Sequence, residues 1–367
     1  MSASRAHSPD YTLLIVTGIL VLVGIFMIAS ASPVIGEARF GEIYFFLKNQ
    51  LLGVGVGVIA FLAGWRIKYT FWKKMAPLIL VASLLLMALV FIPKIGLELK
   101  GAARWIELGP ITIQPSEIMK LAFVMYMAAW LASKQKEVKT FSTGFLPFLI
   151  MLSVVSLFFI LQPDIGTLGV LVITATLLFF AGGGKLAQIG ILCLIGIIGL
   201  GIIVATQPYR LDRISVFLKP SEDIQGIGYQ LNQSLIAIGS GGLWGKGFGM
   251  SQQKFYYLPE PTGDSIFAVF GEEFGFMGNI VLIMLFLLFS WRGIRIANHI
   301  PDSFGSYLAV GITLLIVIQA FINMAAISGL VPLTGLPLSF ISYGSSALVI
   351  NLAAVGMLMN ISKYTRV

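Results

Sequence analysis

The amino-acid sequence predicts an all-α polytopic membrane protein with about ten transmembrane helices, both termini in the cytoplasm and one large extracytoplasmic loop. Three observations support this prediction. Only 11% of the 367 residues are charged and 57% are apolar, with a mean hydropathy of +0.94, whereas a soluble domain carries about 25% charged residues. Long apolar runs recur along the chain, and Lys and Arg gather in alternate connections between them. We therefore expect a single integral membrane domain over residues 1–367.

The predicted spans are runs of roughly 17–25 mainly apolar residues, the length that crosses a bilayer as a helix. The first run is too long for a removed signal peptide and lacks a small-residue cleavage pattern, so we interpret it as a retained span. Cys193, the single cysteine, lies within the seventh run and excludes an intrachain disulfide. His7 and His299 fall outside all ten runs, which argues against histidine catalysis and a zinc site. The runs lie at 11–31, 45–64, 75–93, 115–133, 145–161, 165–181, 185–206, 265–290, 304–327 and 339–360.

The basic residues predict how these spans are oriented. Of the 24 Lys and Arg residues, 13 fall in the termini and in the connections on the same side, such as the one with Lys73 and Lys74 and the one with Arg292 and Arg295. The opposite side holds 6 once the long loop is left out. Because short basic loops stay in the cytoplasm, both termini are expected there. The net charge of +8 is thereby explained by membrane topology, not by nucleic-acid binding.

The long connection at residues 207–264 is therefore expected on the outer side of the membrane. Its middle, Tyr229–Ile238, is weakly amphipathic, and we expect a short helix along the membrane surface there. The glycine-rich run Gly239–Gly249 follows. It does not match the phosphate-binding pattern GxxxxGK(S/T), because Ser240 stands where the first glycine belongs and Gly247 where Ser or Thr belongs. We interpret the run as backbone turns that glycine permits.

Asp264 gives the strongest indication of function, because it stands where this loop meets the eighth span. Placing a charge inside a bilayer costs about 2.5–3.5 kcal/mol even on insertion scales, so such groups pair with a partner or do chemistry. Glu272 and Glu273 lie two turns deeper in the same span. Since adjacent helical residues point about 100° apart, they cannot both face Asp264, and we expect at least one to be a structural pairing group.

Three further polar sites stand at the outer ends of predicted spans. Arg104 lies in the connection before the fourth span, and Glu117 and Lys120 lie in its first turns, where the i,i+3 spacing puts them on one face. Asp164 lies in the short hairpin between the fifth and sixth spans. We expect one outward-facing cavity to gather Asp164, Asp264 and the acid–base pair of the fourth span.

Each of these residues also has a purely structural interpretation, and both interpretations stay open. The acid–base pair of the fourth span would neutralise itself inside the bundle, and Asp164 would cap a helix. Arg104 would be an interfacial anchor instead of a phosphate ligand. Gln319 and Asn323, spaced i,i+4, favour contacts with neighbouring helices over contacts with a ligand.

Six motifs, in the same order along the chain, resemble those of the SEDS family of cell-wall proteins, which comprises FtsW, RodA and SpoVE. The resemblance runs from about residue 11 to residue 363 and is closer to FtsW or SpoVE than to RodA. The family's usual Thr-Asp-Phe reads Gly263-Asp264-Ser265 here, which retains the aspartate, and Ser345 replaces the second glycine of Ser-Tyr-Gly-Gly-Ser. The motifs are Gly101–Ile106, Gln114–Lys120, Gln162–Thr167, Tyr229–Gly249, Lys254–Gly275 and Gly329–Asn360.

The resemblance implies a peptidoglycan glycosyltransferase that polymerises lipid II into β-1,4 glycan strands on the outer face of the membrane, in septal synthesis during cell division. It implies inverting transfer with Asp264 as general base. The basic candidates would stabilise the leaving pyrophosphate, and acidic ones would hold them in place. The substrate-binding candidates are Arg104, Glu117, Lys120, Asp164, Lys246 and Glu260.

The resemblance also implies partners and a location. Lipid II, membrane lipids, a class B penicillin-binding protein that crosslinks the new strand and other division proteins are the expected partners, and nucleic acid is not. The expected location is the bacterial cytoplasmic membrane at the division septum. The sequence shows no closed set of metal ligands, so no cofactor is assigned, and a divalent cation (Mg²⁺ or Mn²⁺) shared by Asp264 with Glu117 or Asp164 is left as an alternative.

The alternative function is a transporter or flippase that moves lipid II across the bilayer. A flippase passes a polar headgroup through its interior and therefore needs polar residues at all depths. Here the ionisable residues concentrate at the outer ends of three spans, which favours an enzyme that works on one face. A third interpretation, a non-catalytic scaffold for a synthase, predicts that Asp264 is replaceable without loss.

Overall fold

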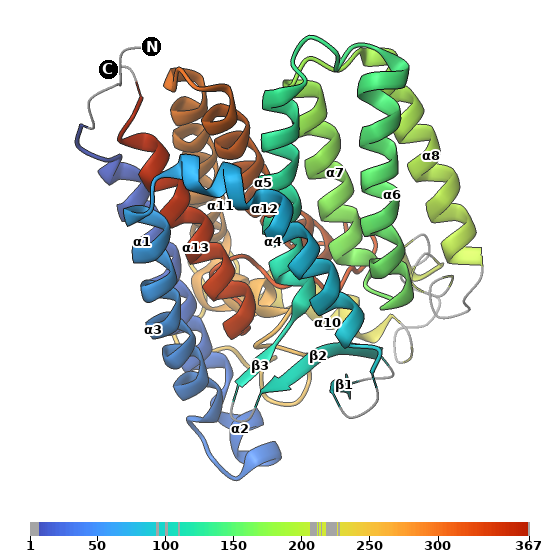
Figure 1. Cartoon of the computed structure of the whole chain (residues 1–367). Helices are drawn as coiled ribbons and strands as arrows, with labels where there is room; N and C mark the ends of the chain where they lie inside the picture. Colours follow the sequence, from blue (N-terminus) through green and yellow to red (C-terminus); the bar gives the residue numbers. More distant parts are fainter. Residues whose placement is uncertain are drawn as a thin grey trace.

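The computed structural model describes residues 7–92, 95–99, 102–108, 111–205, 211, 213, 215–217, 226 and 228–365. Gly101, the first residue of one motif, Arg5 and Arg366 of the basic termini, and much of the predicted loop before residue 228 lie outside this range. The described chain is mostly helical (Figure 1). Its long helices stand side by side, with both chain ends at one end of the bundle and a small sheet at the other.

Within the described residues, long helices occupy each of the ten predicted ranges. Seven are long and apolar enough to cross a membrane, counting α6 together with the π-helical turn η1 (Phe141–Phe145) that precedes it. Helices α7 and α8 are shorter apolar helices, and α5 carries two charged residues in its first turns, so the number of spans stays a prediction. The helices are α1 (Tyr11–Ala31), α3 (Phe45–Arg66), α4 (Tyr69–Leu89), α5 (Pro115–Ser133), α6 (Leu146–Leu161), α7 (Ile165–Ala181), α8 (Leu186–Ala205), α11 (Ile266–His299), α12 (Ser303–Ile327) and α13 (Ser345–Ser362).

The prediction was wrong about where α11 ends. This helix continues to His299, so that histidine lies in the helix and not in the connection after it. The extension is stabilised by Arg292, whose guanidinium forms an ion pair with Asp10 at the start of α1 (2.6 Å). The span was predicted from a run of apolar residues. It therefore ended before Arg292, whose place in the helix depends on an ion pair. Helix α13 begins late, at Ser345, because the residues before it form a turn.

The all-α prediction was also wrong in one detail, because the connection before α5 folds as a sheet. Strands β1 (Gly96–Leu99), β2 (Ala102–Leu108) and β3 (Ile111–Ile113) form an antiparallel sheet in the order β1-β2-β3. Ile106 of the central strand faces Gly96 on one side and Ile113 on the other. The β-branched and aromatic residues of β2 and β3 favour strands, and the Gly-Pro pair between them in the sequence is a turn signal.

Two short helices flank the bundle at the same end as the sheet (Figure 1). Helix α10 (Tyr229–Ser240) confirms the predicted short helix and extends it by half a turn. Helix α2 (Pro33–Phe40) was not predicted. Pro33 begins it, and Gly41, with a φ of 66°, ends it; this pairing of proline at the start and glycine after the end is common in helices.

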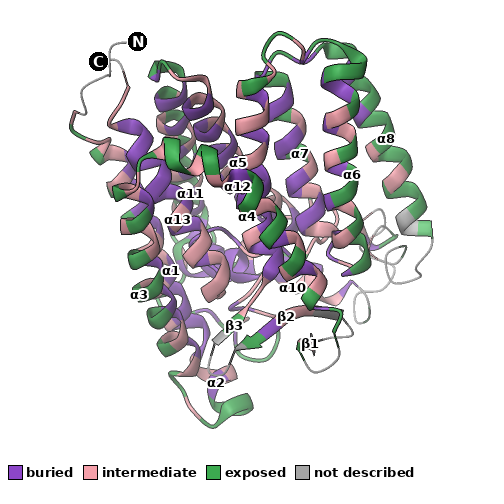
Figure 2. Cartoon of the chain, in the orientation of Figure 1, coloured by how far each residue is buried: buried purple, intermediate pink, exposed green. Residues whose placement is uncertain are grey.

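Burial divides the bundle into a packed interior and a wall of exposed apolar residues (Figure 2). Helices α5, α12 and α13 are largely buried, whereas α3, α4 and α8 expose apolar side chains, as expected of surfaces that meet lipid. Helices α3 and α13 approach at glycines: a Cβ at Gly64 would lie 2.7 Å from the Ala353 carbonyl oxygen. Small residues allow such close approach between helices in membranes.

Helix α11 is broken at Gly275, whose φ of 67° and ψ of −165° are not helical. The glycine-rich run packs its backbone into the break: the Lys246 N–H donates to the Glu272 carbonyl (3.0 Å), and the Phe276 N–H donates to the Gly242 carbonyl (2.8 Å). A Cβ at Gly245 would lie 2.1 Å from the Glu273 carbonyl oxygen, so only glycine fits there. The run is therefore a set of glycine turns, as predicted, and it satisfies backbone groups that a broken membrane helix leaves unpaired.

Candidate active site

Asp264 lies directly before α11, whose N-cap is Ser265. Two amide side chains hold it. Asn323 of α12 donates from Nδ2 to the Asp264 carbonyl oxygen (2.8 Å), and Gln230 of α10 donates from Nε2 to Asp264 Oδ2 (3.1 Å). Both the main chain and the carboxylate of Asp264 are thus positioned by helices that are far apart in the sequence.

The segment at 329–344, which joins α12 to α13, packs against the Asp264 turn, and we call it the clasp segment. Ser342 Oγ donates to the Gly263 carbonyl (2.7 Å), and the Tyr343 N–H donates to the Thr262 carbonyl (2.8 Å). Gly335 faces the carboxylate, since a Cβ there would lie 4.0 Å from Asp264 Oδ2. The clasp segment therefore fixes the turn through neutral groups.

Glu117 and Lys120 form a buried pair on α5, each only 2% exposed. Lys120 Nζ lies 2.9 Å from Glu117 Oε1 and also donates to Gln319 Oε1 of α12 (2.5 Å). Gln319 Nε2 in turn donates to the Pro337 carbonyl of the clasp segment (3.0 Å). The predicted pairing is confirmed, and so is the prediction that Gln319 contacts a neighbouring helix.

Arg104 reaches the residues directly before Asp164, at the start of α7. Asp164 caps that helix by accepting a hydrogen bond from the Thr167 N–H (3.4 Å). Arg104 of β2 donates to the carbonyls of Gln162 (3.1 Å) and Pro163 (2.5 Å), directly before the aspartate. Helix α7 also touches the clasp segment, because a Cβ at its second residue, Gly166, would lie 2.7 Å from the Thr334 carbonyl. The predicted capping of a helix by Asp164 is therefore confirmed.

The clasp segment thus links four of the predicted site residues. It contacts the Asp264 turn directly, reaches Lys120 and its partner Glu117 through Gln319, and contacts Gly166 of the helix that Asp164 caps. They are connected through it and not by direct contact: none of the hydrogen bonds found among the described residues joins Asp264 to the other three. Buried polar atoms remain around the segment. Glu117 Oε2, Asp164 Oδ2 and Thr334 Oγ1 have no hydrogen-bond partner among the described residues. Since buried polar atoms nearly always find a partner, these atoms indicate a place for polar groups of a ligand.

Glu272 and Glu273 lie at the break in α11, and each forms an ion pair with a lysine, although Glu273 Oε2 has no hydrogen-bond partner among the described residues. Glu272 accepts from Lys246 Nζ (2.7 Å) and from Ser251 Oγ (2.5 Å). Glu273 forms an ion pair with Lys254 Nζ (2.8 Å). Lys246 is therefore held in this network and is not brought to Asp264 by any contact found in the described chain. Lys254 was missed as a partner, although two buried carboxylates demand cations.

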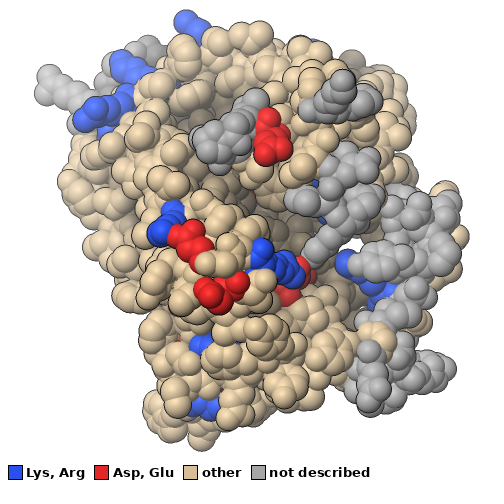
Figure 3. Space-filling model, turned by 90° about the horizontal axis from the view of Figure 1, so that it is seen from below, with Lys and Arg blue, Asp and Glu red and all other residues tan. Residues whose placement is uncertain are grey.

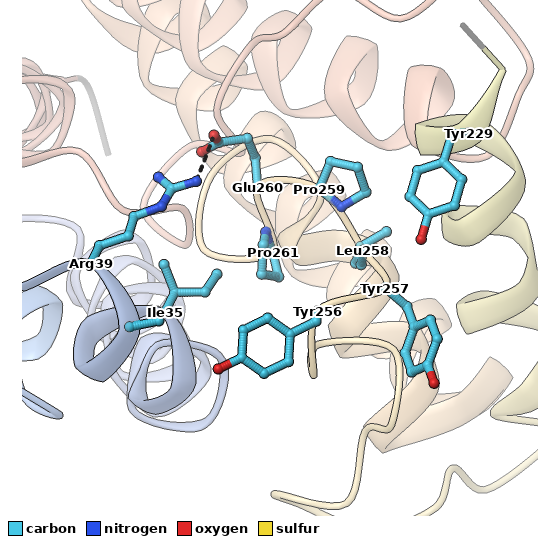
Figure 4. Close-up of a pocket in the computed structure, with 10 residues that line it drawn as sticks. Ile35, Arg39, Tyr229, Tyr256, Tyr257, Leu258, Pro259, Glu260 and Pro261 are labelled. Atoms are coloured by element: carbon cyan, nitrogen blue, oxygen red, sulfur yellow. Dashed lines mark ion pairs between the residues drawn. The ribbon is translucent and has the colours of Figure 1, made fainter. Parts of the chain in front are cut away.

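Glu260 lies away from the pair on α5 and forms an ion pair with Arg39 of α2 at 3.9 Å (Figure 4). The two side chains border a cavity of about 220 Å³ between α2, the start of α10 and residues 256–261. Three tyrosines, Tyr229, Tyr256 and Tyr257, line it. The sequence motif contained Tyr256 and Tyr257 but gave no reason to assign them a role, and Arg39 was missed altogether.

Figure 3 shows the molecule from below, at the end of the bundle that carries the sheet, where acidic and basic side chains lie side by side around a hollow near the middle. Both signs of charge are therefore present at this end of the bundle. Within the described part of the chain, no three His, Cys, Asp or Glu residues are close enough to hold a metal ion. The residues described here thus do not fit the divalent-cation alternative, and no chemical step is derived through a metal.

Comparison with known proteins gives a consistent result. A family model described as cell cycle protein, covering FtsW, RodA and SpoVE, matches residues 11–367. Stage V sporulation protein E of Bacillus subtilis is 45% identical over 363 residues, covering 99% of both chains. A protein named probable peptidoglycan glycosyltransferase FtsW, of Geobacter sp., is 40% identical over 362 residues, again covering 99% of both.

Solved structures show the same fold. The rod shape determining protein RodA of Thermus thermophilus superposes with a TM-score of 0.73 at 24% identity, covering 98% of both chains. A chain from a structure described as a peptidoglycan synthase complex that coordinates polymerization and crosslinking superposes with a TM-score of 0.77 at 24% identity, covering 96% of this chain and 97% of that chain.

Proposed function

The chain belongs to the FtsW/RodA/SpoVE family, and from this premise we propose that it is a peptidoglycan glycosyltransferase that polymerises lipid II into β-1,4 glycan strands. The relatives that carry this activity in their names align along nearly the whole chain. The observation that carries the proposal for this chain is the way Asp264 is held. Its carbonyl, its carboxylate and the carbonyl of the preceding Gly263 each accept a bond from a different element.

The proposed reaction is a single displacement at the anomeric carbon of the donor sugar. The acceptor hydroxyl oxygen attacks this carbon as the bond to the pyrophosphate oxygen breaks, and the lipid pyrophosphate leaves with the electron pair. Replacing an α-linked pyrophosphate by a β-linked sugar inverts the configuration, so one general base is sufficient. The Asp264 carboxylate takes the hydroxyl proton. Because the clasp segment fixes its turn, no reorganisation is needed when the acceptor arrives.

Arg104 and Lys120 are proposed to stabilise the leaving pyrophosphate. An ammonium group has three donors and a guanidinium has five. Lys120 directs two of its donors to Glu117 and Gln319, and Arg104 directs two to main-chain carbonyls. Both cations thus retain donors for phosphate oxygens. Glu117 would keep Lys120 in position, and the carbonyls directly before Asp164 would keep Arg104 in position.

The membrane arrangement is part of the proposal. Ten spans in one integral membrane domain over residues 1–367 would put both termini in the cytoplasm and the loop at 207–264, with Lys246 and Glu260, on the outer side. There these two residues would contact parts of the substrate other than the reacting carbon. The proposed partners are a class B penicillin-binding protein and other division proteins at the septum. The positive connections and the shared end of the two termini in Figure 1 support this orientation.

The test is lipid II polymerisation by the purified protein in liposomes, with and without a class B penicillin-binding protein. Wild type should give glycan ladders, and Asp264→Asn should not. Glu42→Gln is the matched control, because it makes the same carboxylate-to-amide change at an exposed residue paired with Lys48. Polymerisation by Asp264→Asn would show that Asp264 is not the base. If no variant polymerises and labelled lipid II crosses the membrane, the flippase alternative replaces the proposal.

A further inference from the structure

We propose that the cavity between α2, the start of α10 and residues 256–261 binds one sugar unit of the glycan, as a saccharide subsite next to Asp264. This inference rests on the proposed function and adds a residue-level site for the strand. Figure 4 shows the cavity: the ring of Tyr256 extends toward α2, and Tyr257 and Tyr229 lie on the other side.

The aromatic lining suits a sugar. Tyr256 and Tyr257 are 77% and 58% exposed, although large aromatic side chains gain from burial. A pyranose ring presents a face of C–H groups, which packs on an aromatic ring, and a rim of hydroxyls, which bond to polar groups. Pockets that combine aromatic walls with a few placed polar groups are typical of small-molecule sites.

The charged residues at the cavity favour a neutral sugar over the pyrophosphate as its ligand. Arg39 and Glu260 stand together at its rim, so their charges offset each other. A pyrophosphate site would need an excess of cations. A paired arginine and glutamate instead supply hydrogen-bond donors and acceptors for hydroxyl and N-acetyl groups without a net field.

The backbone of the cavity wall is strained, and strain of this kind gathers at ligand sites. Tyr256 has a φ of 68° and Glu260 a φ of 47°, in the left-handed region that residues other than glycine rarely occupy. Local hydrogen bonds hold this shape: the Leu258 N–H donates to the Gln253 carbonyl (2.8 Å). The strain keeps the tyrosine rings turned outward and not packed in the core.

The same turn carries Asp264. The Glu260 carbonyl accepts from the N–H groups of Gly263 (3.0 Å) and Ser265 (3.3 Å), the two neighbours of the aspartate. The cavity wall and Asp264 therefore move as one unit. A volume of about 220 Å³ is below the roughly 300–1,000 Å³ that encloses a drug-sized ligand. It suits one sugar ring and excludes the whole lipid-linked disaccharide peptide.

If the subsite holds the growing strand, its loss should affect strand length more than the rate at which glycosidic bonds form. A chain that loses the subsite should still form the first glycosidic bond but should release products early. Its glycan ladders should then shift to shorter strands, while the rate of lipid II consumption falls less than the mean strand length.

The experiment measures binding of a lipid-free GlcNAc–MurNAc oligosaccharide to the purified full chain in detergent, together with the strand-length distribution from lipid II. The variants are Tyr256→Ala, Tyr256→Phe, which keeps the ring, and Tyr257→Ala, whose backbone is not strained. Tyr44→Ala is the control, because Tyr44 is also 58% exposed and does not line the cavity. Thermal unfolding of each variant checks that it is folded.

We expect the alanine variants at Tyr256 and Tyr257 to weaken oligosaccharide binding at least tenfold and to shorten the strands. Tyr256→Phe and Tyr44→Ala should bind like wild type. Equal binding by all variants, or no binding by wild type, overturns the subsite. So does a result in which the alanine variants keep the sugar but lose a class B penicillin-binding protein, because the surface is then a protein interface.

Binding measured in an Asp264→Asn background separates this inference from the proposed function. If the oligosaccharide binds there through the tyrosines and wild type nevertheless fails to polymerise lipid II, the transferase proposal fails and the saccharide site stands. If wild type polymerises and Tyr256→Ala changes neither oligosaccharide binding nor strand length, the saccharide subsite fails and the transferase proposal stands.

Discussion

Carboxylates occur at the break in α11 and directly before its start, and the two groups have different hydrogen-bond partners. At the break in α11, Glu272 and Glu273 are buried, and each meets a lysine and hydroxyl groups. At the start of α11, Asp264 receives one bond on its main-chain carbonyl from Asn323 and one on its carboxylate from the neutral amide of Gln230. Among the described contacts, those of the glutamates at the break neutralise their charge with lysines, whereas those of Asp264 fix the position of its turn.

The largest effect expected from this comparison is on activity. Asp264→Asn should reduce lipid II polymerisation by about 100- to 10,000-fold, the range that general-base catalysis contributes, with the thermal midpoint close to wild type. Glu272→Gln should do the opposite, lowering the midpoint and leaving a folded fraction that polymerises. Both quantities are read from one purified sample of each variant. A large loss of activity in a fully folded Glu272→Gln protein would contradict the distinction.

The next effect is on stability at the break. Lys254→Met leaves Glu273 buried without its cation and should destabilise the protein by about 3–5 kcal/mol, the usual result of removing one partner of a buried pair. The double variant Lys254→Met, Glu273→Gln should recover much of this loss. Unfolding in detergent against temperature or denaturant measures both.

Lys246→Met is the matched control for that prediction. Its side chain is 30% exposed, and Glu272 keeps donors from Ser251, Gln252 and Gln253. The loss should therefore be smaller than for Lys254→Met. Equal losses would show that the two pairs do not differ in burial as described.

A smaller effect is expected from Asn323→Leu, because it leaves the carbonyls of Asp264 and Leu336 without this donor. Leaving a buried acceptor unsatisfied costs about 1–3 kcal/mol. Since the Asp264 turn loses an anchor, the polymerisation rate should fall along with stability. Thr313→Val on the same helix, where the Thr313 hydroxyl donates to the Ala309 carbonyl, should lower stability without an effect on that turn, and the ratio of rate to stability separates the two.

The smallest effect should come from Gln230→Ala. Gln230 donates to the Asp264 carboxylate and to Ser265 Oγ. A hydrogen bond to a charged group contributes about 1.5 kcal/mol at the low end of its range, which corresponds to a rate loss of about tenfold. Gln233→Ala on the same helix is the control. A loss as large as that of Asp264→Asn would mean that Gln230 takes part in the reaction and does more than orient the carboxylate.

Local patterns predicted much of this molecule. Run length and hydropathy located the ten long helices, and the i,i+3 spacing gave the Glu117–Lys120 pair, because both depend on neighbours in sequence. Contacts between distant segments were not predictable in this way. The partner of Glu273 lies 19 residues earlier on a loop, and the clasp segment reaches Asp264 from the next connection. Hydropathy also overlooked the sheet and α2, since neither is a long apolar run.

The break in α11 has a practical consequence for anyone who modifies this protein. On the sequence, Gly241–Gly249 resembles a flexible linker, and Trp244 within it is 78% exposed, so it invites an affinity tag or a protease site. Yet its amides complete the hydrogen bonding of a helix. Hydrogen exchange at the Lys246 and Gly247 amides should be slow, and an inserted tag should break the hydrogen bonds that stabilise α11 at Gly275. The connection between α5 and η1, at Lys134–Thr140, is the safer place for an insertion, because it bonds chiefly to itself.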